Sequence, residues 1–259
     1  MTSLSPRSRV LIEADETVPV DALFVEARFH SPDGEWSPAI PGAVLATLDN
    51  GVLAGRPRPD AGRYPLPDPD TLADALSRWG ADPERPVIVY AVDLDPDDAK
   101  TAARGWFVFR NAGLRDVRVL DGGAAAWSAA RRAPASAGTP AAGPADVTPI
   151  DAAQAAEFGR AATLLDARPY RAFAEGHIPG ATSAPGGEVF DDGRLLPPER
   201  LAEWAASVGV RGGAPVAAYC GGGVAAAGTV FALAALGITA PLYVGSWSHW
   251  SRQGLPSEA

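Results

Sequence analysis

The 259-residue chain has few of the residues that build metal sites and disulfides: one cysteine, Cys220, and three histidines, His30, His177 and His249. A single cysteine cannot form an internal disulfide, and the scattered histidines do not make a metal-ligand set with it. Basic residues are also in deficit, with 22 Lys and Arg against 31 Asp and Glu and a formal net charge of −9. We therefore expect no bound metal, and no nucleic acid or anionic membrane surface as the main partner.

Long apolar runs are missing as well. The first residues, MTSLSPRSRVLIEADE, have no apolar core after their basic residues, and the apolar runs elsewhere are too short or too interrupted to span a bilayer. A cytoplasmic setting without a membrane partner is the expectation, and a thiol there is free to react. The hydrophobic content of 47% suits a globular chain that is long enough for one large domain or two ordinary ones.

The chain does contain an internal repeat, because four short motifs recur in the same order in its two halves. They are LFVEAR (23–28) and TLLDAR (163–168), IPGAV (40–44) and IPGAT (178–182), VIVYA (87–91) and VAAYC (216–220), and LDGGAAAW (120–127) and YVGSWSHW (243–250). Chance similarity would not keep that order. The sequence therefore predicts a duplicated domain.

Residues 131–147, RRAPASAGTPAAGPADV, are rich in Pro, Ala and Gly and lack apolar periodicity, which is typical of an exposed linker. We place an N-terminal domain at 1–132, a linker at 133–147 and a C-terminal domain at 148–259. In the second copy, apolar runs of strand length alternate with helical patterns. The strands are expected at 163–167, 216–219 and 241–244, and the helices at 198–208 and 224–236. The fold class is α/β, with two tandem domains that are each a mainly parallel sheet flanked by helices.

The most informative stretch is APVAAYCGGGVAAAGTVFALAALG (214–237), where a buried strand leads through Cys220 and three glycines into a helix. Ligands of open α/β sheets bind at the carboxyl edge of the strands. Gly221, Gly222 and Gly223 let several backbone N–H groups turn inward and form an anion-binding loop at a helix N-terminus. The positive electrostatic potential of these N–H groups and of the helix dipole also favours a thiolate. The alternative is a buried structural cysteine before an ordinary turn, but such a turn rarely needs three glycines.

Together with DAR (166–168) and GHIPGA (176–181), these motifs make the chain resemble the tandem rhodanese-domain sulfurtransferases, the thiosulfate/3-mercaptopyruvate sulfurtransferase family, most strongly over residues 148–253. The resemblance implies that Cys220 is the catalytic residue and that the N-terminal copy, with Ala91 at the equivalent position, is catalytically degenerate. It also implies a six-residue loop from Cys220 through Val224 to Ala225 that handles the transferred sulfur. No cofactor is expected.

Three further residues are candidates for substrate binding by the same resemblance. Arg168 would bind the carboxylate or sulfonate of the donor, since a guanidinium pairs two oxygens in one plane; a surface salt bridge is the alternative. Arg171 is a second candidate, and Phe29 matches a position where the family often has an aromatic ring facing the cysteine. His177 is interpreted as structural, because the first copy has Ala39 in its place.

The expected reaction is a double displacement in which the Cys220 thiolate takes a sulfane sulfur from a small anionic donor, thiosulfate or 3-mercaptopyruvate. The persulfide then passes the sulfur to cyanide or to a thiol acceptor, either a small thiol or a thioredoxin-like protein. Gly221 and Gly222 after the cysteine leave the choice of donor open. Two alternatives remain: a persulfide carrier or regulatory module without efficient turnover, and a phosphatase, which would need an arginine where this chain has Ala226.

Overall fold

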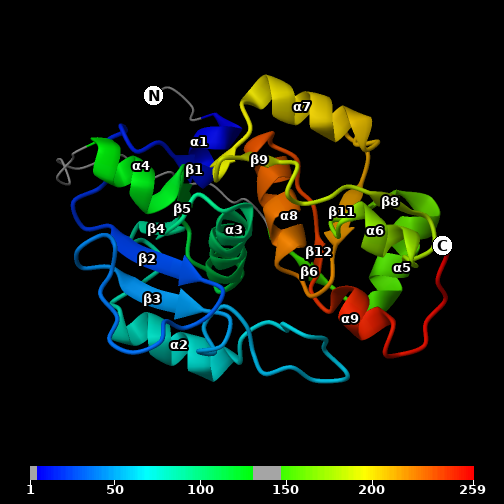
Figure 1. The fold of residues 1–259 in the computed structure, drawn as a ribbon, viewed down its shortest axis with the longest axis horizontal. Helices are drawn as coiled ribbons and strands as arrows, with labels where there is room; N and C mark the ends of the chain where they lie inside the picture. The colour runs from blue at the N-terminus through cyan, green and yellow to red at the C-terminus, as the bar shows by residue number, and fades with distance from the viewer. Residues whose placement is uncertain (1–4, 131–146) are drawn as a thin grey trace.

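The computed structural model describes residues 5–130 and 147–259, and each range contains a five-stranded sheet (Figure 1). The first sheet consists of β1 (Leu11–Ile12), β2 (Leu23–Arg28), β3 (Val44–Thr47), β4 (Val87–Tyr90) and β5 (Val117–Leu120), in the order β1-β5-β4-β2-β3. The second consists of β6 (Pro149–Ile150), β7 (Thr163–Asp166), β8 (Ala181–Ser183), β11 (Val216–Tyr219) and β12 (Leu242–Tyr243), in the order β6-β12-β11-β7-β8.

The two sheets have the same topology, since β1, β5, β4, β2 and β3 correspond in turn to β6, β12, β11, β7 and β8. All neighbouring strands within them are parallel. A short antiparallel pair, β9 (Phe190–Asp191) and β10 (Arg194–Leu195), stands apart. The predicted α/β duplication is therefore confirmed. Most of the predicted linker, residues 133–146, lies outside the described residues, so the domain boundary stays a prediction.

The first half carries α1 (Pro6–Val10), α2 (Pro69–Arg78), α3 (Pro96–Asn111) and α4 (Gly123–Ala130), and the second half carries α5 (Ala152–Ala161), α6 (Tyr170–Ala174), α7 (Pro198–Ser207), α8 (Ala225–Ala235) and α9 (Ser246–Trp250). Several begin at side-chain caps: the Asp68 carboxylate accepts from the Thr71 amide before α2, and Asp151 and Gln154 form a capping box at α5. No helix within the described ranges is both long and apolar enough to cross a bilayer.

Both faces of each sheet are buried, which is why the central strands are apolar throughout. On β4, Val87 and Val89 pack in the core that includes α2 and α3, whereas Ile88 and Tyr90 pack with Trp127 of α4. The central strand of the second sheet, β11, is buried at every residue in the same way. Sheets with helices on both faces place their ligand sites at the carboxyl ends of the strands.

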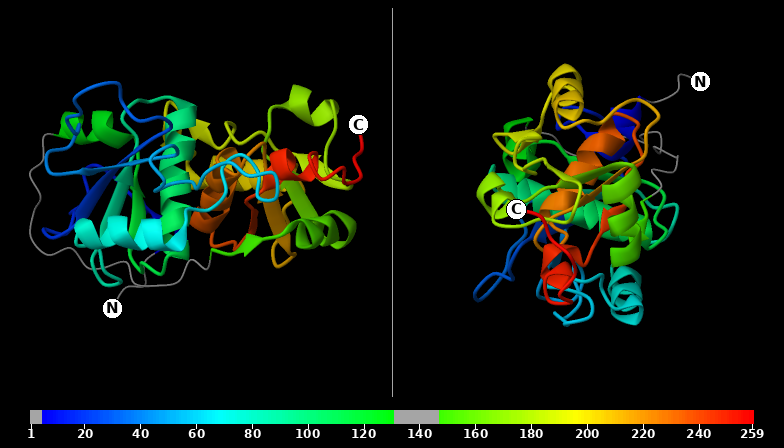
Figure 2. Two further views of the ribbon diagram at one scale, coloured as in Figure 1. Left: turned by 90° about the horizontal axis from the view of Figure 1, so that it is seen from below. Right: turned by 90° about the vertical axis from the view of Figure 1, so that its right-hand side faces the viewer.

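The two halves meet along α3 and α8, which lie side by side between the sheets (Figures 1 and 2). Trp106 of α3 and Phe231 of α8 make an edge-to-face contact with ring centroids 5.4 Å apart. A Cβ atom at Gly228 of α8 would lie 3.2 Å from the Lys100 side chain of α3, so the helices pack closely. One continuous apolar core thus runs through both halves, and α3 is fixed against the helix that follows Cys220.

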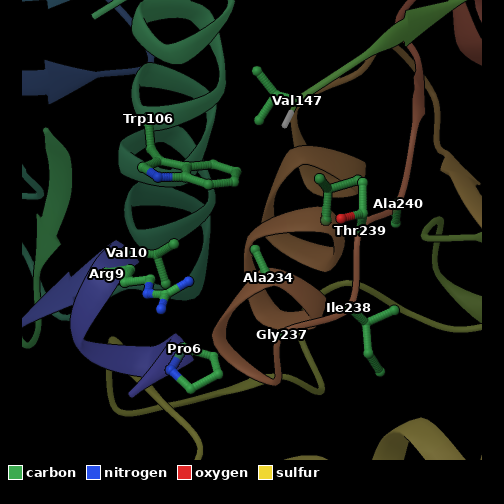
Figure 3. A pocket seen from close by; sticks show the side chains of 11 residues that line it. Pro6, Arg9, Val10, Trp106, Val147, Ala234, Gly237, Ile238, Thr239 and Ala240 are labelled. Carbon is green, nitrogen blue, oxygen red and sulfur yellow. The ribbon is translucent and has the colours of Figure 1, made fainter. Parts of the chain in front are cut away.

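A cavity of about 200 Å³ opens on this seam between α1, α3 and α8 (Figure 3). Trp106, Val10 and Ala234 are among its largely apolar lining residues. Cys220 does not line this cavity.

Candidate active site

Cys220 follows the last residue of β11 at the carboxyl edge of the second sheet, as the sequence predicts. Its side chain is buried. The Gly223 amide donates a hydrogen bond to Cys220 Sγ at 3.1 Å. Gly223 adopts φ +87°, and a Cβ there would lie 2.8 Å from the Val244 carbonyl oxygen. Only glycine can therefore turn its amide toward the sulfur at this position without strain.

The helix α9 holds the loop from the other side. The Trp247 amide donates to the Cys220 carbonyl at 2.9 Å, and the Ser248 amide donates to the Gly221 carbonyl at 3.0 Å. The Ser246 hydroxyl accepts from the Cys220 amide at 3.1 Å and donates to the Tyr243 carbonyl at 2.8 Å. The end of the repeated motif YVGSWSHW thus fixes the backbone on both sides of the thiol.

The thiol lies in a pocket of about 170 Å³ between the two halves. From the second half, the pocket is lined by Cys220, Gly222, Val224 and Ala225, and from the first half by Phe29, Tyr64, Asp97 and Lys100. The structure therefore brings Phe29 together with the predicted loop. The Phe29 and Tyr64 rings meet edge to face with centroids 5.6 Å apart and form one aromatic wall.

The sequence analysis missed three of these pocket residues. Tyr64 lies in the connection between β3 and α2, where none of the repeated motifs falls. Lys100 and Asp97 lie on the first turns of α3 and form an ion pair with each other. The repeat makes α3 the counterpart of α8, because α3 follows β4 as α8 follows the cysteine loop, but no local signal marks these side chains as pocket residues.

Arg168 does not line the thiol pocket. Its Nε and Nη2 atoms bind the Asp166 carboxylate at 2.6–3.0 Å, and Nη2 also donates to the Gly176 carbonyl. The guanidinium stacks 4.4 Å from the centre of the Trp247 ring. Burial opposes the charge of Arg168, but Asp166 outweighs it and the pKa of Arg168 is raised.

Arg168 instead borders a separate hollow of about 500 Å³ on the other side of Gly221, together with Arg63 and Arg252. Arg171 lines neither pocket: its side chain is largely exposed and pairs with Glu175 on α6. The roles of Arg168 and Arg171 in substrate binding stay predictions.

His177 also lines neither pocket. Its ring stacks on Phe173 with centroids 3.8 Å apart, and its Nδ1 atom lies 3.2 Å from the Phe173 carbonyl oxygen. Its backbone pairs with that of Glu258 near the C-terminus. These contacts fit a structural residue. Within residues 5–130 and 147–259, no group of His, Cys, Asp and Glu side chains is arranged to hold a metal ion.

Two α/β domains, with a buried thiol at the strand-to-helix loop of the second, define the class of protein. The model of the rhodanese-like domain matches residues 11–130 and 148–253, so the chain belongs to the rhodanese-like family and carries two such domains. This confirms the family predicted from the motifs.

The particular relatives are sulfurtransferases by name. A Mycobacterium tuberculosis protein named as the thiosulfate sulfurtransferase SseB is 36% identical over 96% of this chain and 96% of its own length. A Pseudomonas aeruginosa protein named as a 3-mercaptopyruvate sulfurtransferase is 37% identical over 89% of each chain. The crystal structure of SseA, a 3-mercaptopyruvate sulfurtransferase from Escherichia coli, is 27% identical and has a TM-score of 0.70 over 92% of this chain and 98% of its own. The predicted enzyme class, a sulfurtransferase, is thereby confirmed.

Proposed function

We propose that this sulfurtransferase carries the sulfur as a persulfide on Cys220 and takes it from 3-mercaptopyruvate in preference to thiosulfate. The observation that carries the proposal is the composition of the thiol pocket. One cation, Lys100, stands among aromatic and aliphatic walls made by Phe29, Tyr64 and Val224. Relatives are named for each of the two donors, so the family as a whole is compatible with either.

The charge of the pocket favours a donor with a single negative group. Lys100 is paired with Asp97, so the two charged side chains of the pocket nearly cancel. Thiosulfate brings two negative charges and no apolar surface, and it would lose its hydration with little compensation. 3-Mercaptopyruvate brings one carboxylate, which Lys100 can bind, and a methylene and keto group that suit the aromatic wall. Its size fits a pocket of about 170 Å³.

The reaction proceeds in two displacements at sulfur. The Cys220 thiolate attacks the donor sulfur, a new S–S bond forms, and the C–S bond of 3-mercaptopyruvate breaks with its electron pair. The leaving enolate takes up the proton of the donor thiol and departs as pyruvate. The Gly223 amide, 3.1 Å from Sγ, hydrogen-bonds the thiolate before the attack. An acceptor thiolate then attacks the outer sulfur of the persulfide and leaves the Cys220 thiolate behind.

The acceptor enters through the same pocket, because Sγ is buried and this opening leads to it. A small thiol fits there directly. A thioredoxin-like protein would insert its reactive cysteine between the aromatic wall and the loop. Cyanide is small enough to replace either in an assay and would leave as thiocyanate.

The proposal is tested by the kcat/KM of the two donors, measured with cyanide as acceptor. We expect 3-mercaptopyruvate to exceed thiosulfate by about tenfold or more. Lys100→Met should lower the value for 3-mercaptopyruvate by about ten- to hundredfold, because a hydrogen bond to a charged group contributes about 1.5–3 kcal/mol. Asp97→Asn is the matched control, because it frees Lys100 from its ion pair. It should reduce the ratio of the kcat/KM for 3-mercaptopyruvate to that for thiosulfate.

Mass spectrometry after donor addition should show one extra sulfur atom on the native chain and none on Cys220→Ser. Normal transfer by Cys220→Ser, a native preference for thiosulfate, or a ratio of the two kcat/KM values that Asp97→Asn leaves unchanged would each contradict the proposal. A chain that becomes persulfidated by a protein donor but turns over neither small compound would instead be a sulfur carrier.

A further inference from the structure

The hollow of about 500 Å³ beside Gly221, called the basic hollow below, carries an excess of positive charge. Its charged lining residues are three arginines and one glutamate: Arg63, Arg168, Arg252 and Glu175. Asp166 neutralises Arg168, and Glu175 is paired with Arg171 of α6. The charges of the two remaining arginines are therefore not offset by these pairs.

These two arginines, Arg63 and Arg252, are exposed at the surface of the hollow. Within residues 5–130 and 147–259, neither guanidinium makes a hydrogen bond or an ion pair. The chain as a whole has a formal net charge of −9, so two unpaired cations that face one hollow are opposite in sign to the protein around them. A concave surface of this kind concentrates anions.

The walls of the basic hollow are tied to the cysteine loop. The Arg63 amide donates to Ser248 Oγ at 2.9 Å, and the Ser248 amide donates to the Gly221 carbonyl at 3.0 Å. The Gln253 side chain donates to the Pro59 carbonyl at 3.1 Å, so the connection between β3 and α2 lies against α9 (Figures 1 and 2). The backbone around the hollow is thus preorganised relative to the thiol, which lowers the cost of binding.

The basic hollow and the thiol pocket are neighbours, because adjacent residues line them. Tyr64 and Gly222 line the thiol pocket, and Arg63 and Gly221 line the hollow. A Cβ at Gly222 would lie 2.9 Å from the Tyr64 ring and 3.3 Å from Arg63 Cβ, so these residues form a thin partition. Consecutive Cα atoms are about 3.8 Å apart, so a side chain within about three residues of an acceptor cysteine can cross the partition.

We propose that the basic hollow is a docking subsite for the sulfur acceptor, and that it fits a protein thiol with acidic side chains next to its cysteine. This inference rests on the proposed function, in which the acceptor thiol enters the thiol pocket and reaches Cys220. The acidic side chain binds Arg63 and Arg252, since a guanidinium pairs both oxygens of a carboxylate. Charges at the rim of an interface mainly speed association, so such a protein is preferred over a neutral thiol.

The test uses Cys220, the only cysteine of the chain, as the reporter. Two synthetic peptides carry their cysteine as a mixed disulfide with 2-thiopyridine and differ only in having glutamate or glutamine on both sides of it. The Cys220 thiolate attacks the peptide sulfur, a disulfide between Cys220 and the peptide forms, and pyridine-2-thione leaves and is measured by its absorbance. The readout is the ratio of the second-order rate constants for the acidic and the neutral peptide.

Arg63→Gln and Arg252→Gln should each lower this ratio by about two- to fivefold, the range expected for an exposed ion pair. Added salt should lower the native ratio as well. Arg200→Gln is the matched control, because it removes the same charge from an exposed arginine of α7 that lines neither pocket. It should leave the ratio in place. The different reactivities of the two peptides cancel, since every variant meets the same pair.

A ratio that Arg63→Gln and Arg252→Gln leave unchanged, or that Arg200→Gln lowers as far, would overturn the inference. So would a loss of 3-mercaptopyruvate turnover with cyanide that exceeds the loss of preference for the acidic peptide, because it would assign the hollow to the donor. These readouts are separate from the proposed function: a native chain that transfers sulfur from neither donor defeats that proposal, while the exchange rates still decide whether the hollow binds an acidic partner.

Discussion

Replacing Gly223 by alanine tests how the loop holds its sulfur. The residue adopts φ +87°, where an alanine costs about 1–2 kcal/mol relative to its ordinary conformations. The added Cβ would also lie 2.8 Å from the Val244 carbonyl oxygen, and relieving such a clash in a packed site costs about 1–3 kcal/mol more. We expect Gly223→Ala to lower the free energy of unfolding by about 2–5 kcal/mol.

The effect on activity follows from the amide. If the peptide rotates to relieve the strain, its N–H no longer points at Cys220 Sγ, and a hydrogen bond to a charged group contributes about 1.5–3 kcal/mol. The kcat/KM for 3-mercaptopyruvate should then fall by about ten- to hundredfold. Urea unfolding and steady-state kinetics measure the two effects on the same preparation.

Gly221→Ala is the comparison within the same loop. Gly221 lies outside the left-handed region, and a Cβ there meets nothing within 4 Å. This variant should stay within about 0.5 kcal/mol of the native stability and keep far more of the activity. Equal losses of activity in the two alanine variants would refute the assignment of the Gly223 amide as the group that holds the sulfur.

Three further predictions concern single buried residues. Cys220→Ser should abolish sulfur transfer while the fold, measured by circular dichroism, is unchanged. Arg168→Ala should lower the free energy of unfolding by about 3–5 kcal/mol in urea titrations, because it leaves the buried Asp166 without its partner; unchanged stability with a raised KM would instead make Arg168 a donor-binding residue. Burial raises the pKa of Glu26, but hydrogen bonds from the Ala39 amide and three side chains outweigh it, so that pKa lies below its ordinary value of 4.5. Ionised Glu26 therefore stabilises the fold above pH 4.5, and this stabilisation is lost as the pH falls through the pKa of the folded state. The free energy of unfolding should consequently fall less for Glu26→Gln than for the native chain between about pH 6 and about pH 3.

Much of the fold could be predicted from the sequence, because the repeat and the alternation of apolar runs are local signals. The predicted helices 198–208 and 224–236 end within one residue of α7 and α8, and the predicted strand 216–219 coincides with β11. The strand predicted at 241–244 is shorter, since β12 covers only two residues. Apolar side chains indicate burial, but a strand also needs hydrogen bonds to a neighbouring strand. The apolar pattern does not show at which residue these hydrogen bonds end.

From local sequence, the site could be predicted only as far as it lies on one segment, and Phe29 was placed beside the cysteine by the family resemblance alone. The cysteine and its glycines are contiguous, so their strand-to-helix geometry follows from local sequence. Tyr64, Asp97 and Lys100 come from the other half, and the two charged residues reach the thiol pocket because α3 packs against α8. That packing depends on the shapes of two apolar helix surfaces, and no spacing in either segment specifies it.

The repeat also separates structural from catalytic residues, because the copy that lacks the nucleophile serves as an internal control. Arg28 binds the Glu26 carboxylate at 2.7 Å just as Arg168 binds Asp166, although Ala91 replaces the cysteine in the first copy. The tyrosine hydroxyls of both copies likewise accept a hydrogen bond from an amide of the IPG turn, and in both copies an amide of the last helix, α4 or α9, donates to the carbonyl of residue 91 or 220.

What both copies keep holds the sheet edge in shape, and the Arg28–Glu26 and Arg168–Asp166 pairs are of this kind; donor binding by Arg168 stays a prediction. What the second copy alone has is a thiol before three glycines, which we propose carries the chemistry. Lys100 lies in the copy without the nucleophile and reaches the thiol pocket across the seam. In the proposed mechanism, therefore, one copy supplies the reactive sulfur and the other supplies the cation that binds the donor.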